Sequence, residues 1–266
     1  MMDHLLRDLA PISDSAWKAI EVEAKARLTT FLAARKLVDF DGPHGWEHPA
    51  TPTGRVTTIS PPGEGVAARQ RQVLPLVELR AQFRLSRAEL EDVERGRDDV
   101  DFGQLDTAAH RIALAENVAV LHGYGPAQIT GITEASSHEP IPLGDSMERY
   151  PTSVSMALDR LRQAGIDGPY GLAIGPAGYA GIVETTEHGG YLLFDHLRRI
   201  LDGPLVWAPG VEGAVVVSLR GGDFLLTCGQ DLSVGYLSHT AEEVTLYLEE
   251  SLSFRVLEPD AAVALR

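Results

Sequence analysis

The sequence predicts a mixed α+β protein, and three patterns of hydrophobic residues lead to this fold class. Apolar side chains recur at steps of three and four over residues 13–35, which indicates an amphipathic helix. Apolar residues stand at every second position over 77–85 and 244–256, where only Glu250 interrupts the second run, and this indicates two long strands. Helix and strand patterns alternate from about residue 131 to 221, which indicates a small α/β subdomain.

Composition and charge narrow the classes of function. The chain has 266 residues, of which 44% are hydrophobic, so it is long enough to bury a large core. Its net charge of −15 argues against binding to nucleic acid or to an anionic membrane surface. No apolar run is long enough to cross a bilayer, and the N-terminus carries acids unlike a secretory signal, so we expect a cytoplasmic protein. The single cysteine, Cys228, excludes an internal disulfide and a cysteine-based metal cluster.

The first predicted helix has suitable residues at both ends. Ser13 and Asp14 are plausible N-caps, and Arg35 and Lys36 suit the C-terminal end of the helix dipole. The apolar stripe of this helix either packs on the core of its own domain or docks, as an arm, on something else. The stripe comprises Trp17, Ile20, Ala24, Leu28, Phe31 and Leu32.

Residues 46–80 are predicted to form a long protruding hairpin. Gly and Pro recur in the loop Asp41–Pro52, and Ser60–Gly65 is expected to be the exposed tip. A two-stranded ribbon buries little of its own surface, so we expect it to lie on a neighbour. His44 and His48 have the spacing of a metal-binding pair on a helix, but the surrounding Gly and Pro residues disfavour a helix, and we predict no metal site.

The remaining elements follow from capping residues and periodicity. The final long strand needs an equally long partner, and Val77–Leu85 is the candidate. The polar loop Glu184–Gly190 should be exposed to solvent. Helices are predicted over Ser86–Arg95, Leu105–Leu121, a segment ending at Gly165, a segment starting at Pro176 and Leu192–Leu201; strands are predicted over Tyr170–Ile174, Leu205–Ala208 and Ala214–Leu219.

The Gly-rich stretch Gly221–Tyr236 has the composition of a catalytic loop, since it contains Asp223, Cys228 and Asp231. A buried, unreactive thiol is the commoner role for a cysteine inside a predicted strand, and aspartates beside glycines commonly cap turns. The sequence also contains no G-x-S-x-G, P-loop, H-E-x-x-H or C-x-x-C motif. We therefore predict no catalytic residue, no metal and no cofactor.

Eight short motifs follow one another along nearly the whole chain. They are Asp8–Pro11 before Trp17, Arg35–Asp39, Gly42–Trp46, Pro75–Arg80, Asp92–Gly96, Asp167–Tyr170, Arg220–Phe224 and Gly229–Tyr236. No one of them is specific alone, but in this order they resemble the encapsulins, bacterial nanocompartment shell proteins first described as linocin-type bacteriocins.

The resemblance implies the α+β fold of tailed-phage major capsid proteins, the Hong Kong phage type. Its parts would be an N-terminal helical arm over residues 1–37, a peripheral domain over 38–130 with an extended loop at about 46–80, an axial domain over 131–221, and return strands with a C-terminal segment over 222–266. The helix, hairpin, long strands and α/β subdomain predicted from the residues alone correspond to the same parts.

The resemblance also implies two sites. Encapsulins bind a C-terminal targeting peptide of the cargo between the arm helix and the peripheral domain. The matching positions here are Leu28, Phe31, Leu32, Arg35, Asp39, Leu232 and Val234. A five-fold pore would be formed by Glu184, Thr185, Thr186, Glu187, His188, Gly189 and Gly190, where the chain departs from the frequent His-Gly-Tyr-Pro pattern. Some relatives bind flavin through a tryptophan whose position is Ala88 here, so no flavin is predicted.

The leading hypothesis is therefore a non-catalytic shell protein. Identical copies, sixty being the minimum for an icosahedral shell, would enclose an iron-storage or oxidative-stress enzyme such as a ferritin-like protein or a dye-decolourising peroxidase. Small molecules would pass through the pores. Two alternatives remain open, namely a hydrolase or bacteriocin activity, and a phage-derived capsid protein. The acidic charge favours a protein cargo over a packaged genome.

Overall fold

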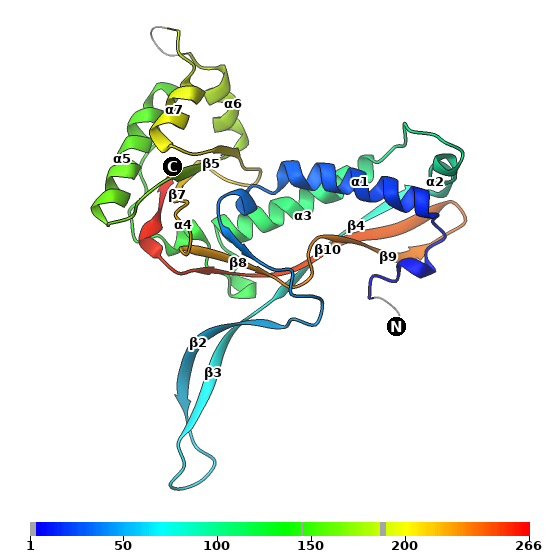
Figure 1. The fold of residues 1–266 in the computed structure, drawn as a ribbon, viewed down its shortest axis with the longest axis horizontal. Helices are drawn as coiled ribbons and strands as arrows, with labels where there is room; N and C mark the ends of the chain where they lie inside the picture. Colours follow the sequence, from blue (N-terminus) through cyan, green and yellow to red (C-terminus); the bar gives the residue numbers. More distant parts are fainter. Residues whose placement is uncertain (1–3, 145, 187–189) are drawn as a thin grey trace.

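A computed structural model gives the fold of the chain and describes residues 4–144, 146–186 and 190–266. Figure 1 shows two lobes side by side, with a narrow ribbon extending away from both. The paired strands of the described residues form a five-stranded sheet, a four-stranded sheet and the two-stranded ribbon. This is the mixed α+β architecture that the sequence predicts. None of the helices in the described ranges is long and apolar enough to cross a membrane.

The elements have the following bounds. The helices are α1 (Asp14–Phe31), α2 (Arg87–Glu94), α3 (Gly103–Leu121), α4 (Ile132–Ala135), α5 (Tyr150–Gln163), α6 (Pro176–Glu184) and α7 (Leu193–Leu201), with short 3₁₀ turns η1 (Arg7–Leu9), η2 (Ala34–Lys36), η3 (Gly125–Ala127), η4 (Met147–Arg149) and η5 (Pro259–Ala261). The strands are β1 (Asp39–Asp41), β2 (Ala50–Ile59), β3 (Ala68–Pro75), β4 (Val77–Ser86), β5 (Tyr170–Ile174), β6 (Leu205–Trp207), β7 (Ala214–Ser218), β8 (Phe224–Cys228), β9 (Ser233–His239), β10 (Glu243–Val256) and β11 (Ala262–Leu265).

The long strand β10 organises the five-stranded sheet. The sheet has the order β1-β8-β10-β4, and β9 also pairs with β10. β10 runs antiparallel to β4 from Glu243 opposite Ser86 to Leu252 opposite Val77, which confirms the predicted pairing of the two long strands. α3 packs on β4 and β10, and α1 packs on α3. The core between them includes Phe83, Leu85, Val244, Leu246 and Leu248.

The first helix is shorter than the sequence predicts. Ser13 caps its N-terminus by accepting a hydrogen bond from the Ala16 amide at 3.3 Å, as expected. The α-helix ends at Phe31, however, and not at Arg35. The backbone amides of Ala33 and Ala34 donate instead to the side-chain Oδ1 of Asn117, at 2.9 and 3.0 Å. These hydrogen bonds to α3 change the direction of the chain, so that Arg35 lies in the separate turn η2.

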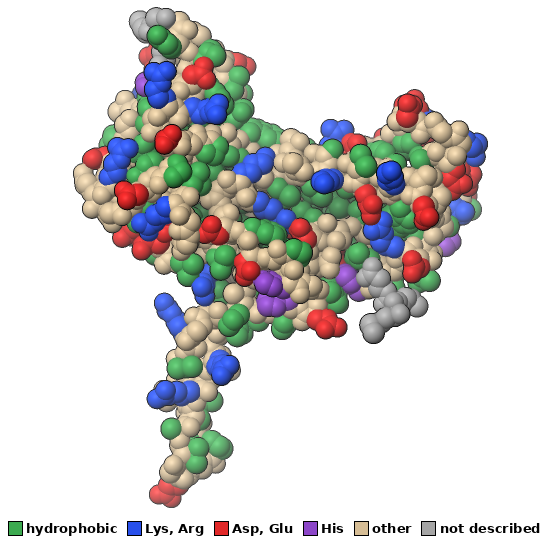
Figure 2. Space-filling view, viewed as in Figure 1, with side chains coloured by type: hydrophobic (Ala, Val, Ile, Leu, Met, Phe, Trp, Pro, Cys, Tyr) green, Lys and Arg blue, Asp and Glu red, His purple; other side chains and the backbone are tan. Residues whose placement is uncertain are grey.

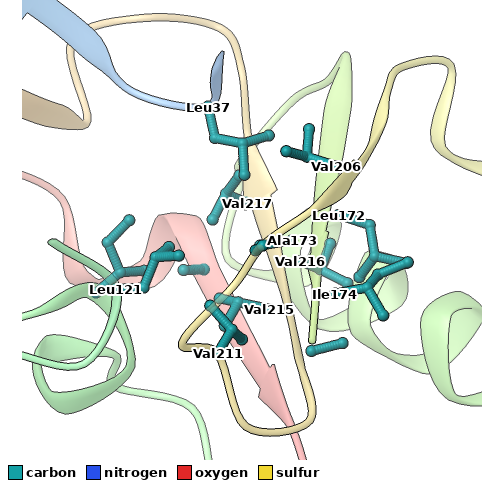
Figure 3. Close-up of a cluster of buried hydrophobic side chains, with 14 of the residues drawn as sticks. Leu37, Leu121, Leu172, Ala173, Ile174, Val206, Val211, Val215, Val216 and Val217 are labelled. Carbon is teal, nitrogen blue, oxygen red and sulfur yellow. The ribbon is translucent and has the colours of Figure 1, made fainter. Parts of the chain in front are cut away.

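The second lobe contains the α/β subdomain. Its sheet has the order β11-β7-β5-β6, and helices α5, α6 and α7 lie around it (Figure 1). The predicted strands at 170–174, 205–208 and 214–219 are confirmed within one residue, whereas β11 was not predicted. Figure 3 shows Leu37, from the end of η2, and Leu121, the last residue of α3, beside the apolar side chains of β5, β6 and β7. Their cluster also includes Phe224, Leu252 and Phe254 of the five-stranded sheet and so joins the two lobes, while the core under α1 is a second cluster.

The ribbon consists of β2 and β3, paired antiparallel with a register shift between Pro52 and Val56. It leaves the body of the protein, as Figure 1 shows, and most of its side chains are exposed. Its bounds differ from the expected 46–80, because residues 77–80 already belong to β4 in the main sheet. The expected loop at 41–52 likewise contributes to two strands, since Asp41 ends β1 and Ala50 begins β2.

Candidate functional site: a groove beside the first helix

A groove of about 400 Å³ runs between α1 and the start of β9. Its apolar surface comes from both sides, because α1 and the residues after it supply Leu28 and Leu32 while the opposite wall supplies Leu232 and Val234. Leu28, Leu32 and Val234 also belong to the hydrophobic core, so the groove is a continuation of that core toward the surface. The full lining is Arg7, Glu21, Ala24, Lys25, Leu28, Thr29, Leu32, Arg35, Asp231, Leu232, Ser233, Val234 and Leu248.

The structure brings together five of the seven predicted groove residues. Leu28, Leu32, Arg35, Leu232 and Val234 all line this cavity. The arrangement follows from two elements, since helical spacing places the first two on one face of the arm and strand β9 supplies the last residue.

The other two predicted residues, Phe31 and Asp39, lie elsewhere. Because α1 ends at Phe31, this ring turns toward His110 and Trp207, with ring centroids 5.0 and 6.0 Å away. Asp39 begins β1, and its carboxylate accepts a hydrogen bond from the Gly222 amide at 2.6 Å. Gly222 has a φ of +82°, which a residue without a side chain adopts readily. Asp39 therefore holds a turn, and neither residue lines the groove.

Arg35 closes one end of the groove and is held by three carboxylates. Its Nε donates to Glu116 at 2.7 Å, its Nη1 to Asp231 at 2.7 Å and its Nη2 to Glu250 at 2.9 Å. The guanidinium also lies over the Phe40 ring, 5.0 Å from its centroid. A guanidinium held in this way is a fixed wall and offers few free donors to a ligand.

The side chains of Glu116 and Glu250 are 0% exposed, which is unusual for carboxylates. Burial raises the pKa of Glu116, although the charge of Arg35 opposes this. Burial and the neighbouring Glu116 raise the pKa of Glu250 well above its ordinary value. Burial alone would lower the pKa of Arg35, but Glu116, Glu250 and Asp231 together raise it, so Arg35 stays charged.

Sequence reasoning missed Glu116 and Asn117, which sit inside an Ala-rich helix where nothing in the pattern marks them. Glu250 did carry a signal, because it is the only charge on the predicted apolar face of β10. Asn117 accepts the Ala33 and Ala34 amides and donates to the Phe31 and Pro209 carbonyls, at 2.9 and 3.1 Å. This one side chain therefore fixes the chain direction after the arm.

The rim of the groove is charged. Arg7 and Glu21 both line the groove and form an ion pair at 2.6 Å. Lys25 lines the same rim, and its ammonium has no ion-pair partner in the described parts of the chain. The groove thus combines apolar side chains with a Lys25 ammonium that forms no ion pair with described residues.

The end of the stretch Gly221–Tyr236 forms one wall of the groove, through Asp231, Leu232, Ser233 and Val234. Burial raises the pKa of the Cys228 thiol to about 12, with a further contribution from Asp231, so the thiolate nucleophile is scarce at neutral pH. Asp223 is held by Arg220 at 2.8 Å, and Asp231 is held by Arg35. Over residues 4–144, 146–186 and 190–266, no group of three or more His, Cys, Asp or Glu could hold a metal ion.

The predicted pore loop is described only at its two ends. Glu184 is the last residue of α6, the Thr185 carbonyl accepts the Leu193 amide at 3.1 Å, and Thr186 forms a bridge with Leu192. Gly190 has a φ of +82°. The predicted residues Glu187, His188 and Gly189 lie outside the described residues.

Comparisons with known proteins agree with this architecture. The family model described as "Encapsulating protein for peroxidase" matches residues 2–253. The type 1 encapsulin shell protein of Rhodospirillum rubrum is 49% identical, over 100% of this chain and 97% of its own. Among solved structures, the virus-like particle from Pyrococcus furiosus matches with a TM-score of 0.62 and 19% identity, over 94% of this chain and 99% of its own. The capsid of an empty GTA particle matches with a TM-score of 0.57 and 15% identity, over 88% and 89%.

The structural likenesses define the fold class, which is that of phage capsid proteins and related particles. Its parts here are the long paired strands β4 and β10, the spine helix α3, the α/β lobe and the ribbon. Sequence identity over the full length then defines the family. The chain belongs to the encapsulins, the shell proteins of bacterial nanocompartments.

Proposed function

We propose that copies of this chain assemble into a closed icosahedral shell that encloses a peroxidase, and that the groove beside α1 binds a C-terminal tail of that enzyme. Sixty copies are the smallest number that builds such a shell from identical subunits. The shell itself is proposed to be non-catalytic, free of nucleic acid and cytoplasmic. The loop at residues 184–190 is proposed to line its five-fold pore.

The convergence of five predicted residues on one cavity is the observation that carries the tail-binding proposal. A few apolar side chains of a tail, buried at about 1.5–3 kcal/mol each and offset by the ordering of the peptide, are consistent with micromolar affinity for each site. Many sites facing an oligomeric cargo then add avidity. A peroxidase is favoured over a ferritin-like cargo because the matching family is described by a peroxidase.

Leu32→Asp tests the groove, because it places a charge where the tail's apolar side chains would be buried. We expect intact shells whose peroxidase content falls at least about tenfold, in line with the loss of one buried leucine contact and the added desolvation of a charge. Shells would be co-expressed with a tailed peroxidase, checked by negative-stain microscopy and assayed for haem absorbance per subunit.

Val22→Asp is the matched control, since Val22 lies on the same helix but is 62% exposed and does not line the groove. It should leave loading unchanged. Lys25→Glu is a milder second variant on the rim, where packing is not disturbed. Undiminished peroxidase loading in Leu32→Asp shells would contradict the tail-binding proposal. Iron without haem in wild-type shells purified from the native cells, without the co-expressed peroxidase, would indicate a ferritin-like cargo instead.

A further inference from the structure

Two buried carboxyl groups lie next to each other beside Arg35, which lines the groove. Glu116 comes from α3 and Glu250 from β10, and Arg35 binds one oxygen, Oε2, of each. Both Oε1 atoms are buried and have no hydrogen-bond donor in the described parts of the chain. The two carboxyl groups nevertheless lie close enough to hydrogen-bond to each other once one of them carries a proton. Buried acceptors without donors are costly, so a proton between them would satisfy both.

The local charge balance also demands a proton. Arg35 from η2 is the cation that faces the pair, while Asp231, in the turn after β8, is a third carboxylate on the same guanidinium. Cys228 from β8 also faces this cluster, and burial together with Asp231 raises its pKa, so it stays a neutral thiol. The Asp231 side chain is 43% exposed and is also solvated by water, whereas the Glu116 and Glu250 side chains are 0% exposed. One cation cannot balance these two buried carboxylates while it also pairs with Asp231, and two adjacent carboxylates in a dry site hold one proton jointly.

We propose that Glu116 and Glu250 share a single proton and that this protonated pair is the positioning device that fixes Arg35 at the end of the groove. Loss of the proton leaves two adjacent negative charges buried in the core, so the turn that carries Arg35 opens more often. This proposal concerns the shell protein itself and does not depend on what occupies the groove.

The direction of the pH effect follows from linkage. An opened turn exposes the carboxyl groups to water, where they lose their protons near the ordinary value of 4.5, whereas the closed state retains one proton to higher pH. The closed state therefore binds more protons, and its stability is complete below the ordinary carboxyl pKa and falls as the pH rises toward the raised one. A difference of one proton changes the opening equilibrium by about tenfold per pH unit.

The amides of Ala33 and Ala34 give a local measurement, because both donate to Asn117, the neighbour of Glu116, and are released when η2 opens. Native-state hydrogen exchange of assembled shells, followed by mass spectrometry between about pH 5 and pH 8, gives their protection factors. In the wild-type protein we expect these protection factors to fall by up to about tenfold per pH unit. Glu250→Gln, which replaces the protonated carboxyl by a neutral amide of the same shape, should flatten this pH dependence.

Glu249→Gln is the matched control, because Glu249 is the next residue of β10, is equally buried and pairs with Arg80 on the other side of the strand. It should keep the wild-type pH dependence. Glu116→Gln serves as the second variant if Glu250→Gln does not assemble, and it should flatten the pH dependence in the same way. Equal pH dependence in the wild type and the amide variants would overturn the proposal, as would flattening by Glu249→Gln alone.

Discussion

The ribbon β2–β3 and the central pair β4–β10 are both long antiparallel strand pairs, but only the central pair has a core. Val244, Leu246 and Leu248 of β10 are all 0% exposed beneath α3 and α1. In the ribbon, Val56 is 53% exposed and Val73 is 48% exposed. Antiparallel pairing thus gives one region that stabilises the subunit and another that has apolar surface left for a partner.

Charge separates the two regions as well. Arg55, Arg69 and Arg71 are exposed on the ribbon and form no ion pair with described residues, whereas Glu64 near the tip is its only acid. Figure 2 shows basic side chains along the ribbon and an acidic one at its end. The rest of the chain is strongly acidic. A cationic ribbon on an acidic protein is suited to lie on another copy of the same chain.

The largest expected effect is on the central pair. Leu246→Ala should destabilise the subunit by about 2–5 kcal/mol, because it leaves a cavity between β10 and the helices above it. Urea unfolding followed by circular dichroism measures this change. Val73→Ala in the ribbon is the comparison and should stay within about 0.5 kcal/mol. Similar losses in both variants would remove the contrast between the regions.

A smaller effect on stability, but a decisive one on assembly, is expected in the ribbon. Val56→Asp combined with Val73→Asp should leave the circular dichroism spectrum of the subunit unchanged and abolish shells, because the charges would be buried against a neighbour. Size-exclusion chromatography and negative-stain microscopy report the outcome, and Val56→Thr is the conservative control. Shells formed at the wild-type yield would show that the ribbon is not an interface.

The smallest effect is expected from thiol labelling, which compares a buried cysteine in the main sheet with a cysteine placed in the ribbon. Cys228 is buried and its pKa is raised to about 12, so iodoacetamide near neutral pH should not modify it in free subunits or in shells. A cysteine placed in the ribbon by Thr58→Cys should be labelled in free subunits and protected in shells. Mass spectrometry after labelling distinguishes the two sites. Equal labelling of the ribbon cysteine before and after assembly would contradict the proposed contact.

The sequence predicts those parts of the fold in which apolar residues recur with the regular spacing of a strand or a helix. The alternation in β4 and β10 is complete enough to define both strands and their pairing. Helical spacing put Leu28 and Leu32 on one stripe of the first helix, the resemblance implied that they belong to a groove, and both residues line a cavity in the structure. The resemblance assigned Phe31 to the same groove, but Phe31 does not line the cavity, because the helix stops where Asn117, 84 residues away from Ala33, accepts the following amides. Such a stop depends on a distant side chain and leaves no local pattern.

The sequence predicts those residues of the candidate site that lie on one face of a helix or strand. It does not predict the ion pairs between residues of different elements. Glu250 interrupts an apolar strand, so its burial was visible as an anomaly, but its partner Glu116 has no such mark. Asp39 matched a motif and was assigned to the groove, although its carboxylate holds the Gly222 turn. Partnerships between residues from different elements require the tertiary structure.

Asn117 has a consequence for engineering. Its amide links the end of α1, the spine helix α3 and the Pro209 carbonyl between β6 and β7, so three regions converge on one side chain. The arm, the spine and the α/β lobe are therefore not interchangeable modules. A chimaera that exchanges the α/β lobe must reproduce the backbone at Pro209 to preserve the hydrogen bonds of Asn117. Grafts onto the tip of the ribbon leave these hydrogen bonds unchanged.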